Sequence, residues 1–78
     1  MLSAVSPPRG HASRGLTARE RDIARQLMAG GTSKEIGREL GISPRTVEGY
    51  RARLMRKLGV ANQRQLVARL VADAALAA

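Results

Sequence analysis

The chain has 78 residues, enough for one small domain, and its 14 Lys and Arg against 6 Asp and Glu give a formal net charge of +8. This charge favours an anionic partner, nucleic acid first and a membrane surface second. The absence of Cys excludes disulfides, thiol chemistry and cysteine-bound zinc. Tyr50 is the single Phe, Tyr or Trp residue, so the chain offers few aromatic side chains on which the bases of single-stranded DNA or RNA could stack. Duplex DNA is therefore the favoured partner.

Residues 1–15 are predicted to form a disordered linker, because they combine prolines, glycines and serines with no apolar periodicity. The single histidine, His11, lies in this segment, and we expect it to be solvated. The apolar stretch at residues 2–5 is too short for a secretory signal, and that at 66–78 is too short to span a bilayer. We therefore expect a cytoplasmic protein without a membrane partner.

Residues 17–28 and 32–40 are predicted to form two helices, each beginning with a Thr-x-x-Glu capping box. In this box the Thr hydroxyl accepts from the Glu amide, and the Glu carboxylate accepts from the Thr amide. Gly30-Gly31 ends the first helix and Gly41 ends the second. The apolar residues at helical spacing are Ile23, Ala24, Leu27 and Met28 in the first helix and Ile36 and Leu40 in the second.

A longer basic helix is predicted over residues 44–58, with Ser43 as its N-cap, Pro44 at its first position and Gly59 just past its end. The connection from the preceding helix is only Gly41-Ile42. A turn this short that contains Gly makes two helices cross at a large angle. The two helices are therefore predicted to form a helix-turn-helix.

The two sides of this basic helix differ in character. At about 100° per residue, Val47, Leu54 and Leu58 form a narrow apolar seam that can pack on a core. The opposite face carries Arg45, Glu48, Gly49, Ala52 and Arg56. Small residues there allow close approach to DNA, and the surrounding cations attract phosphate. A solvated charged face is the alternative, and the helix-turn-helix pattern upstream favours DNA binding over it.

A fourth helix is predicted to begin at Asn62, with Gln65 at the capping-box position. Its apolar residues form two rows, with Leu66, Leu70 and Ala74 expected to close the core and Val67 and Val71 beside them. Either both rows belong to the core, or the wide stripe also serves as a dimer surface, because so small a domain has few apolar side chains to spare. The predicted dimer contact comprises Val67, Leu70, Val71 and Ala74.

Four ordered blocks of sequence carry a resemblance to a known family: LTARER at 16–21, GGTSKEI at 30–36, SPRTVE at 43–48 and LMRKLGV at 54–60. With this spacing, residues 16 to about 72 resemble the LuxR-type DNA-binding domain. That domain is the output module of many two-component response regulators of the NarL/FixJ class and of quorum-sensing regulators. The resemblance implies an all-α, four-helix helix-turn-helix domain over residues 16–76, following the tail at 1–15.

The resemblance also implies that the basic helix lies in the major groove and that the domain binds inverted half-sites as a dimer through its fourth helix. The residues expected to face base edges are Arg45, Glu48, Gly49, Ala52 and Arg53. The residues expected to contact the DNA backbone are Thr32, Ser33, Lys34, Ser43, Thr46, Tyr50, Arg51, Arg56 and Lys57. Further expected partners are an upstream receiver or ligand-binding domain outside these 78 residues and RNA polymerase. We expect no cofactor and no metal.

Four positions depart from the family's usual pattern. Glu48 stands where many members carry a basic or polar residue; it can accept from cytosine N4 but repels phosphate. Gly49 replaces a larger side chain, and Tyr50 replaces a common histidine. We expect the Tyr50 ring to pack near the apolar seam, with its hydroxyl reaching a phosphate or water. Gly37 replaces the usual alanine, and we expect a slightly underpacked core there.

Three other classes of protein fit the sequence less well. A promoter-binding sigma-factor domain also ends in a basic helix-turn-helix, but the block at 16–21 and the helix from Asn62 fit that class less well. A helical adaptor with a basic docking face would keep a protein complex and show no salt-sensitive DNA binding. An enzyme is not predicted, because the only carboxylates paired at helical spacing, Glu35 and Glu39, lie beside cations, and no nucleophile–base pair or phosphate-binding Gly loop is present.

Overall fold

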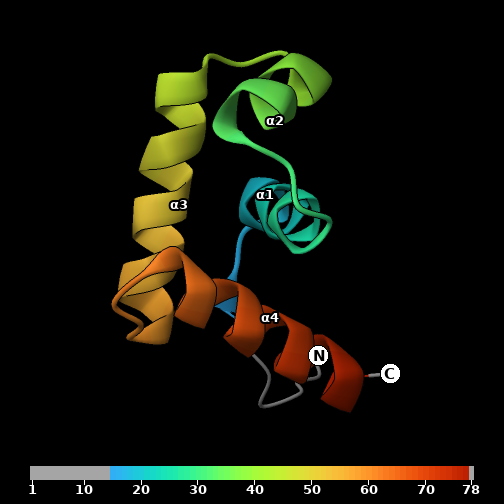
Figure 1. The fold of residues 1–78 in the computed structure, drawn as a ribbon, viewed down its shortest axis with the longest axis vertical. Coiled ribbons are helices and arrows are strands. Elements are labelled where there is room, and N and C mark those ends of the chain that lie inside the picture. The colour runs from blue at the N-terminus through green and yellow to red at the C-terminus, as the bar shows by residue number, and fades with distance from the viewer. Residues whose placement is uncertain (1–14, 78) are drawn as a thin grey trace, which may run out of the picture.

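The computed structural model describes residues 15–77 as four helices, with no strand among those residues. In chain order they are α1 Ala18–Met28, α2 Ser33–Leu40, α3 Pro44–Leu58 and α4 Gln63–Ala77 (Figure 1). The predicted all-α class and helix-turn-helix order are confirmed. Apart from Gly15, the predicted linker lies outside the described residues, and so does His11. Within the described part, no helix combines the length and apolar character needed to cross a membrane.

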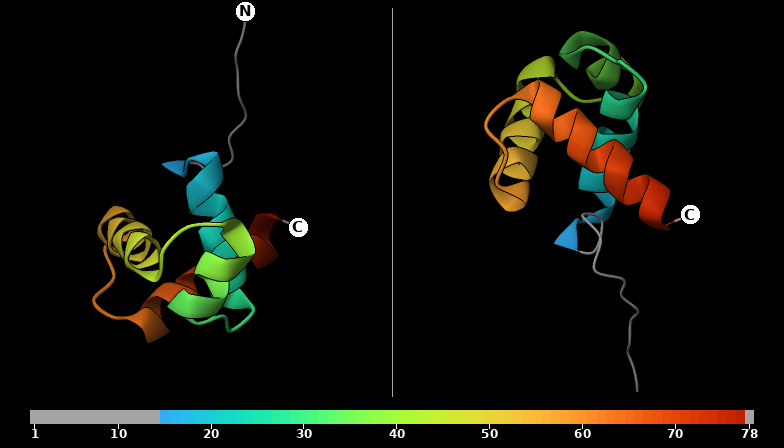
Figure 2. Two further views of the ribbon diagram at one scale, coloured as in Figure 1. Left: turned by 90° about the horizontal axis from the view of Figure 1, so that it is seen from above. Right: turned by 60° about the horizontal axis from the view of Figure 1, so that its bottom comes forward.

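Helix α3 stands along one side of the molecule, and the other three helices pack on its inner side (Figure 1). The short helix α2 crosses the first half of α3, and α4 begins beside its last turns. Seen from above, α3 lies at the edge of the bundle (Figure 2). One long side of α3 is therefore left uncovered by the rest of the domain.

The core lies between the four helices and receives apolar side chains from each of them. The buried apolar residues are Leu16, Ile23, Ala24, Leu27, Ile36, Val47, Leu54, Leu66 and Leu70. Met28, Leu40 and Leu58 are partly buried against them, as the helical spacing predicts. The apolar seam of α3 thus faces the core, which turns the opposite face of this helix to the solvent.

The capping boxes predicted for the first two helices are both present. The hydroxyl oxygen of Thr17 accepts from the Glu20 amide at 3.1 Å, and Glu20 Oε1 accepts from the Thr17 amide at 2.9 Å. Thr32 and Glu35 form the same pair of hydrogen bonds at 3.1 and 2.9 Å. Each box satisfies amides that a helix start otherwise leaves unpaired, so α1 and α2 begin at defined residues.

The turn between α2 and α3 corrects the expectation that the core is underpacked at Gly37. Gly37 is buried, and a Cβ at this position would lie 2.5 Å from the carbonyl oxygen of Ile42. The glycine therefore lets the turn pack directly on α2. Gly41 supports the turn with a φ of +73°, and Ser43 caps α3 by accepting from the Thr46 amide at 3.1 Å.

The placement of α4 confirms the core prediction for Leu70 and corrects it for Ala74. Leu70 is 4% exposed and belongs to the domain's own core, so the proposed dimer surface is limited to the other residues of the stripe. Ala74, expected in the core, is exposed, because the second half of α4 runs out beyond the other helices (Figure 1). Val71 is 49% exposed, and Val67 is partly buried.

Candidate nucleic-acid interface

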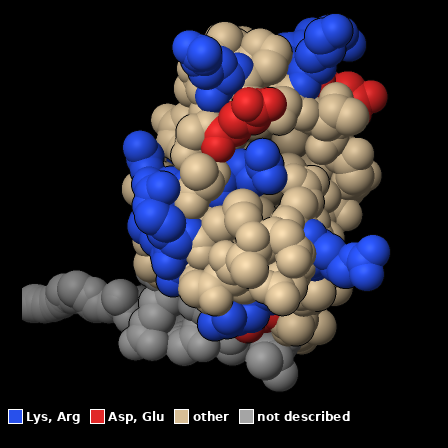
Figure 3. Space-filling model, turned by 60° about the vertical axis from the view of Figure 1, so that its left-hand side comes forward, with Lys and Arg blue, Asp and Glu red and all other residues tan. Residues whose placement is uncertain are grey.

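The outer face of α3 brings most of the predicted base-facing residues together. Its exposed residues include Arg45, Glu48, Gly49, Ala52, Arg53 and Arg56. Figure 3 shows Lys and Arg side chains spread around this side of the molecule, with uncharged surface and an acidic side chain between them. At Gly49, nothing lies within 4 Å of the place that a Cβ would take. A ligand can therefore approach the helix backbone closely at the middle of this face.

A hollow of about 250 Å³ lies beside this glycine and is lined by Thr46, Gly49, Tyr50 and Arg53. The guanidinium carbon of Arg53 lies 5.3 Å from the centroid of the Tyr50 ring, a cation–π distance. The Tyr50 ring is partly buried against the core, as predicted. The Tyr50 ring thus packs beside the Arg53 guanidinium at the hollow.

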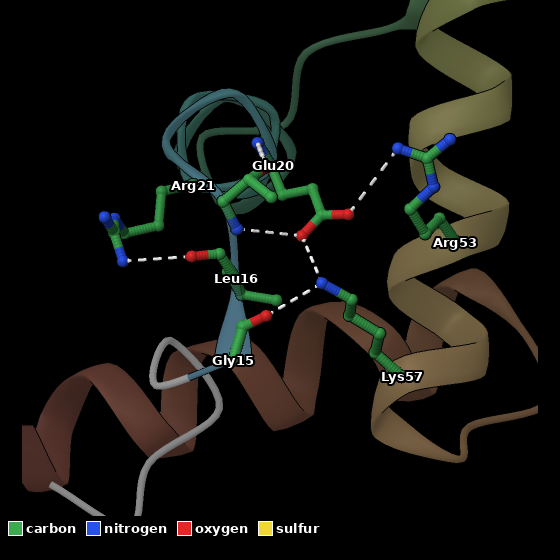
Figure 4. A network of polar contacts seen from close by, with 7 residues as sticks. Gly15, Leu16, Glu20, Arg21, Arg53 and Lys57 are labelled. Atoms are coloured by element: carbon green, nitrogen blue, oxygen red, sulfur yellow. Dashed lines mark hydrogen bonds and ion pairs between the residues drawn. The ribbon is translucent and has the colours of Figure 1, made fainter. Parts of the chain in front are cut away.

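A buried carboxylate lies between α1 and α3. Glu20 of α1 is 0% exposed, and its Oε1 accepts from Lys57 Nζ of α3 at 2.7 Å (Figure 4). The same ammonium group donates to the carbonyl oxygen of Gly15 at 2.7 Å. The second oxygen, Oε2, lies 3.8 Å from Arg53 Nη1 and has no hydrogen-bond partner. Glu20 therefore joins α1 to two cations of α3.

The pKa of Glu20 is lowered from its ordinary value. The largest cause is the hydrogen bond from Lys57, followed by the hydrogen bond from the Thr17 amide. The charges of Lys57 and Arg53 lower the pKa further, whereas burial raises it. The carboxylate is therefore ionised at neutral pH even though it is buried.

This network was not found by sequence reasoning, which assigned Glu20 only to the capping box. Glu20 and Lys57 are 37 residues apart, so no local spacing connects them. Lys57 was predicted to contact the DNA backbone, but the structure places its ammonium group on Glu20 and Gly15. Gly15, assigned to the linker, is thereby tied to α3.

The remaining predicted backbone contacts lie on α3 and at the starts of two helices. Thr32 and Lys34 are exposed at the start of α2, where Ser33 is half-buried. At the start of α3, the hydroxyl groups of Ser43 and Thr46 lie 2.9 Å apart and both residues are exposed. Helix starts carry free amides and partial positive charge, which favours phosphate.

These features can be compared with known proteins. Residues 14–70 match the family model described as "Bacterial regulatory proteins, luxR family". The chain belongs to the luxR family of bacterial regulatory proteins. The family resemblance inferred from the four sequence blocks is therefore confirmed.

Several curated relatives are similar over the same region. The transcriptional regulatory protein UhpA of Escherichia coli (strain K12) is 53% identical over 55 residues, which is 70% of this chain and 28% of UhpA. The transcriptional regulatory protein FixJ of Azorhizobium caulinodans is 49% identical over 53 residues, 68% of this chain and 25% of FixJ. The chain thus matches little more than a quarter of the length of these relatives. No solved structure matches it significantly.

Family membership fixes the general activity of the site. The luxR family is one of helix-turn-helix DNA-binding domains in transcription regulation, and UhpA and FixJ are transcriptional regulatory proteins. It is not an enzyme family. The exposed face of α3 is therefore the candidate DNA-binding face.

Proposed function

We propose that this domain binds duplex DNA sequence-specifically, with α3 in the major groove, as the output domain of a bacterial transcriptional regulator. The outer face of α3 is the observation that supports this proposal. Gly49 and Ala52 are small residues that leave the helix backbone accessible, and Arg45, Arg53 and Arg56 surround them. A major groove admits one helix, and a low, cationic face lets its backbone approach the base edges. The tight turn after α2 and the shared core hold this face in place.

The base contacts are proposed from the chemistry of each exposed side chain. Arg45 or Arg53 can donate two hydrogen bonds to O6 and N7 of guanine, at about 1–3 kcal/mol of discrimination for each good pair. Glu48 can accept from cytosine N4, and Ala52 can contact a thymine methyl group. Gly49 adds no side chain, so one domain reads few bases directly. DNA deformability and a second half-site are proposed to supply the remaining specificity.

The backbone contacts are proposed to come from two helix starts and from the flanks of α3. The residues concerned are Thr32, Ser33, Lys34, Ser43, Thr46, Tyr50, Arg51 and Arg56. Hydroxyl groups and amides at helix starts bind phosphate, and each Arg or Lys that neutralises a phosphate releases counterions. The affinity should therefore fall steeply as the salt concentration rises.

We further propose that two domains bind inverted half-sites and meet through α4. The surface for this contact consists of Val67, Val71 and Ala74, beyond the buried Leu70. An exposed valine next to a partly buried one provides a small apolar patch. The patch is small, so we expect dimers to form on DNA and the free domain to be monomeric at micromolar concentration.

The rest of the regulator is proposed from the length of its relatives. Because the matched region is only 28% of UhpA and 25% of FixJ, most of each relative lies outside it. We propose that a receiver or ligand-binding domain precedes this domain in the intact regulator. Contact with RNA polymerase and a cytoplasmic location follow from the same proposal.

The proposal is tested by titrating the purified domain against random duplex DNA at several salt concentrations. A preferred sequence is then selected from a random pool. Salt-sensitive binding that enriches an inverted repeat supports the proposal and gives the half-site spacing. If the domain binds no DNA even at low salt, the proposal is refuted, and the basic face becomes a docking surface for an acidic protein.

A further inference from the structure

Among the described residues, the second carboxylate oxygen of Glu20 is the buried side-chain polar atom without a hydrogen-bond partner. Oε2 is buried and accepts no hydrogen bond, although the pair of oxygens carries a full negative charge. Its cationic neighbour on this side is Arg53, whose Nη1 lies 3.8 Å away. Because a buried carboxylate oxygen without a donor is costly, Glu20 attracts the Arg53 guanidinium toward this position.

Arg53 is thus held from two directions. The carboxylate of Glu20 attracts one end of its guanidinium (Figure 4). Its central carbon lies 5.3 Å from the centroid of the Tyr50 ring. Its side chain is nevertheless 53% exposed and lines the hollow beside Gly49. A guanidinium has five N–H donors, and Glu20 takes none of them at hydrogen-bond distance. The donors turned to the hollow remain available to a ligand.

A fixed orientation of the Arg53 guanidinium matters more for binding a base than for binding a phosphate. A guanine offers O6 and N7 in one plane, so two parallel hydrogen bonds require the guanidinium to lie in that plane. A phosphate accepts donors from many directions, and a mobile cation satisfies it nearly as well. Arg53 also lies close to Gly49, near the middle of the exposed face, where base edges rather than phosphates meet a recognition helix.

We propose that Glu20 is a positioning residue for DNA recognition: together with Tyr50 it holds the guanidinium of Arg53 in the orientation that binds one guanine through O6 and N7. This inference rests on the proposed function, because it presupposes that α3 lies in the major groove. Glu20 itself does not touch the DNA. Its buried charge acts on the base only through Arg53.

The test uses the preferred DNA site found by selection. Each guanine in the site is replaced in turn by 7-deazaguanine, which pairs normally but lacks the N7 acceptor. We expect one guanine per half-site at which this replacement lowers the affinity of the wild-type domain about tenfold. Arg53→Lys should abolish that difference, because a lysine cannot form the paired contact. If Arg53→Lys keeps the difference, Arg53 does not read this guanine and the inference is overturned.

Glu20→Gln then tests the positioning role. Glutamine keeps the size of the side chain and an oxygen for the Thr17 amide, but it removes the charge that attracts Arg53. We expect Glu20→Gln to shrink the 7-deazaguanine effect to about twofold or less, with little change in affinity for random DNA. In an Arg53→Lys background, Glu20→Gln should cause no further change. If Glu20→Gln weakens binding to all sequences equally and keeps the full guanine effect, its role is only structural and the inference is overturned.

Two controls separate positioning from stability. Ile23→Val removes a buried methylene from the same helix without touching the network, and it should leave the guanine effect unchanged. Tyr50→Leu removes the ring from the other side of Arg53 while the Glu20–Lys57 pair stays, and it provides a second test if Glu20→Gln does not fold. We expect Tyr50→Leu to reduce the guanine effect and Tyr50→Phe, which keeps the ring, to retain it. Equal guanine effects in the two Tyr50 variants would overturn the inference.

The wild-type titration distinguishes this inference from the proposed function. If the wild-type domain binds no DNA, the proposed function fails and this inference fails with it. If the wild-type domain selects a site but no guanine responds to 7-deazaguanine, only this inference fails.

Discussion

The ammonium group of Lys57 lies 2.7 Å from Oε1 of Glu20, which joins the last turn of the recognition helix to the first turn of α1. The same ammonium group donates to the Gly15 carbonyl oxygen, so the chain just before α1 is fixed to α3 as well. The Glu20 carboxylate also completes the capping box with Thr17. One buried side chain therefore serves a helix start and an interhelical ion pair at the same time.

Glu20→Ala should lower the free energy of unfolding by roughly 2–3 kcal/mol, because hydrogen bonds to charged groups contribute about 1.5–3 kcal/mol and the capping box is lost as well. The measurement is urea unfolding followed by circular dichroism. Glu35→Ala is the matched control, since Glu35 occupies the same capping-box position on α2 but is exposed. It should cost about 1 kcal/mol or less. Equal losses in the two variants would show that the buried ion pair contributes nothing to stability.

Stability should fall with acid in a way that depends on Glu20. Its pKa is lowered in the folded state relative to an ordinary value of 4.5, mainly by the Lys57 hydrogen bond. The folded state therefore binds this proton less readily than the unfolded state, so the contribution of Glu20 is complete above about pH 4.5 and is lost as the pH falls toward the folded pKa. The difference in unfolding free energy between the wild type and Glu20→Gln should thus persist above about pH 4.5 and shrink as the pH is lowered further. A difference that stays constant as the pH is lowered would contradict the prediction.

Gly49→Ala should raise the free energy of unfolding by about 0.5–1 kcal/mol, because alanine is the better helix former. Nothing lies within 4 Å of the added Cβ. Gly37→Ala is the matched comparison: its Cβ would lie 2.5 Å from the Ile42 carbonyl oxygen, so the turn must move and the gain should be lost. Thermal unfolding of both variants tests the pair. A Gly37→Ala domain as stable as the Gly49→Ala domain would show that the turn shifts without cost.

Arg56→Ala should weaken binding to all DNA sequences by a similar factor. If Arg56 neutralises one phosphate, the slope of log affinity against log salt becomes shallower by about 0.9. Arg64→Ala, which removes the same charge from the exposed start of α4, is the control and should change the slope less. Titrations at four salt concentrations distinguish the two variants. Identical slopes would mean that net charge matters here and that the position of Arg56 does not.

Val71→Asp should weaken binding to a DNA with two half-sites while binding to a single half-site stays the same, because the proposed α4 contact forms only between two bound domains. Val71 is 49% exposed, so the free energy of unfolding should change by no more than about 0.5 kcal/mol. Ala72→Asp places the same charge on another side of α4 and serves as the control. If both variants bind the two-site DNA equally well, α4 is not the dimer contact.

The recognition helix shows how far sequence reasoning extends. Ser43, Pro44 and Gly59 predicted the ends of α3 correctly, because capping and left-handed backbone depend on residues next to one another. The helical spacing of Val47 and Leu54 predicted which side is buried. The base-facing residues followed from the same geometry, since the side opposite a buried seam is exposed.

The errors, at Ala74 and Gly37, occurred where contact depends on distant segments. The spacing of Leu70 and Ala74 could show that they share a stripe, but only the packing of α4 on α1 and α3 decides that Leu70 is covered and Ala74 is not. Gly37 gave a similar error, because its neighbour is the carbonyl of a turn whose path no local pattern describes.

By itself, the sequence determined the four helices, the ends of the first three, the helix-turn-helix and the family, since each depends on spacing within a few residues or on the order of short motifs. The tertiary structure alone decided that Glu20 is buried against Lys57 and faces Arg53. A charge pair across 37 residues forms only when the core brings α1 and α3 together, and burial then strengthens the pair by excluding water. The sequence shows where these charged residues stand along the chain, whereas the fold sets the distances between them.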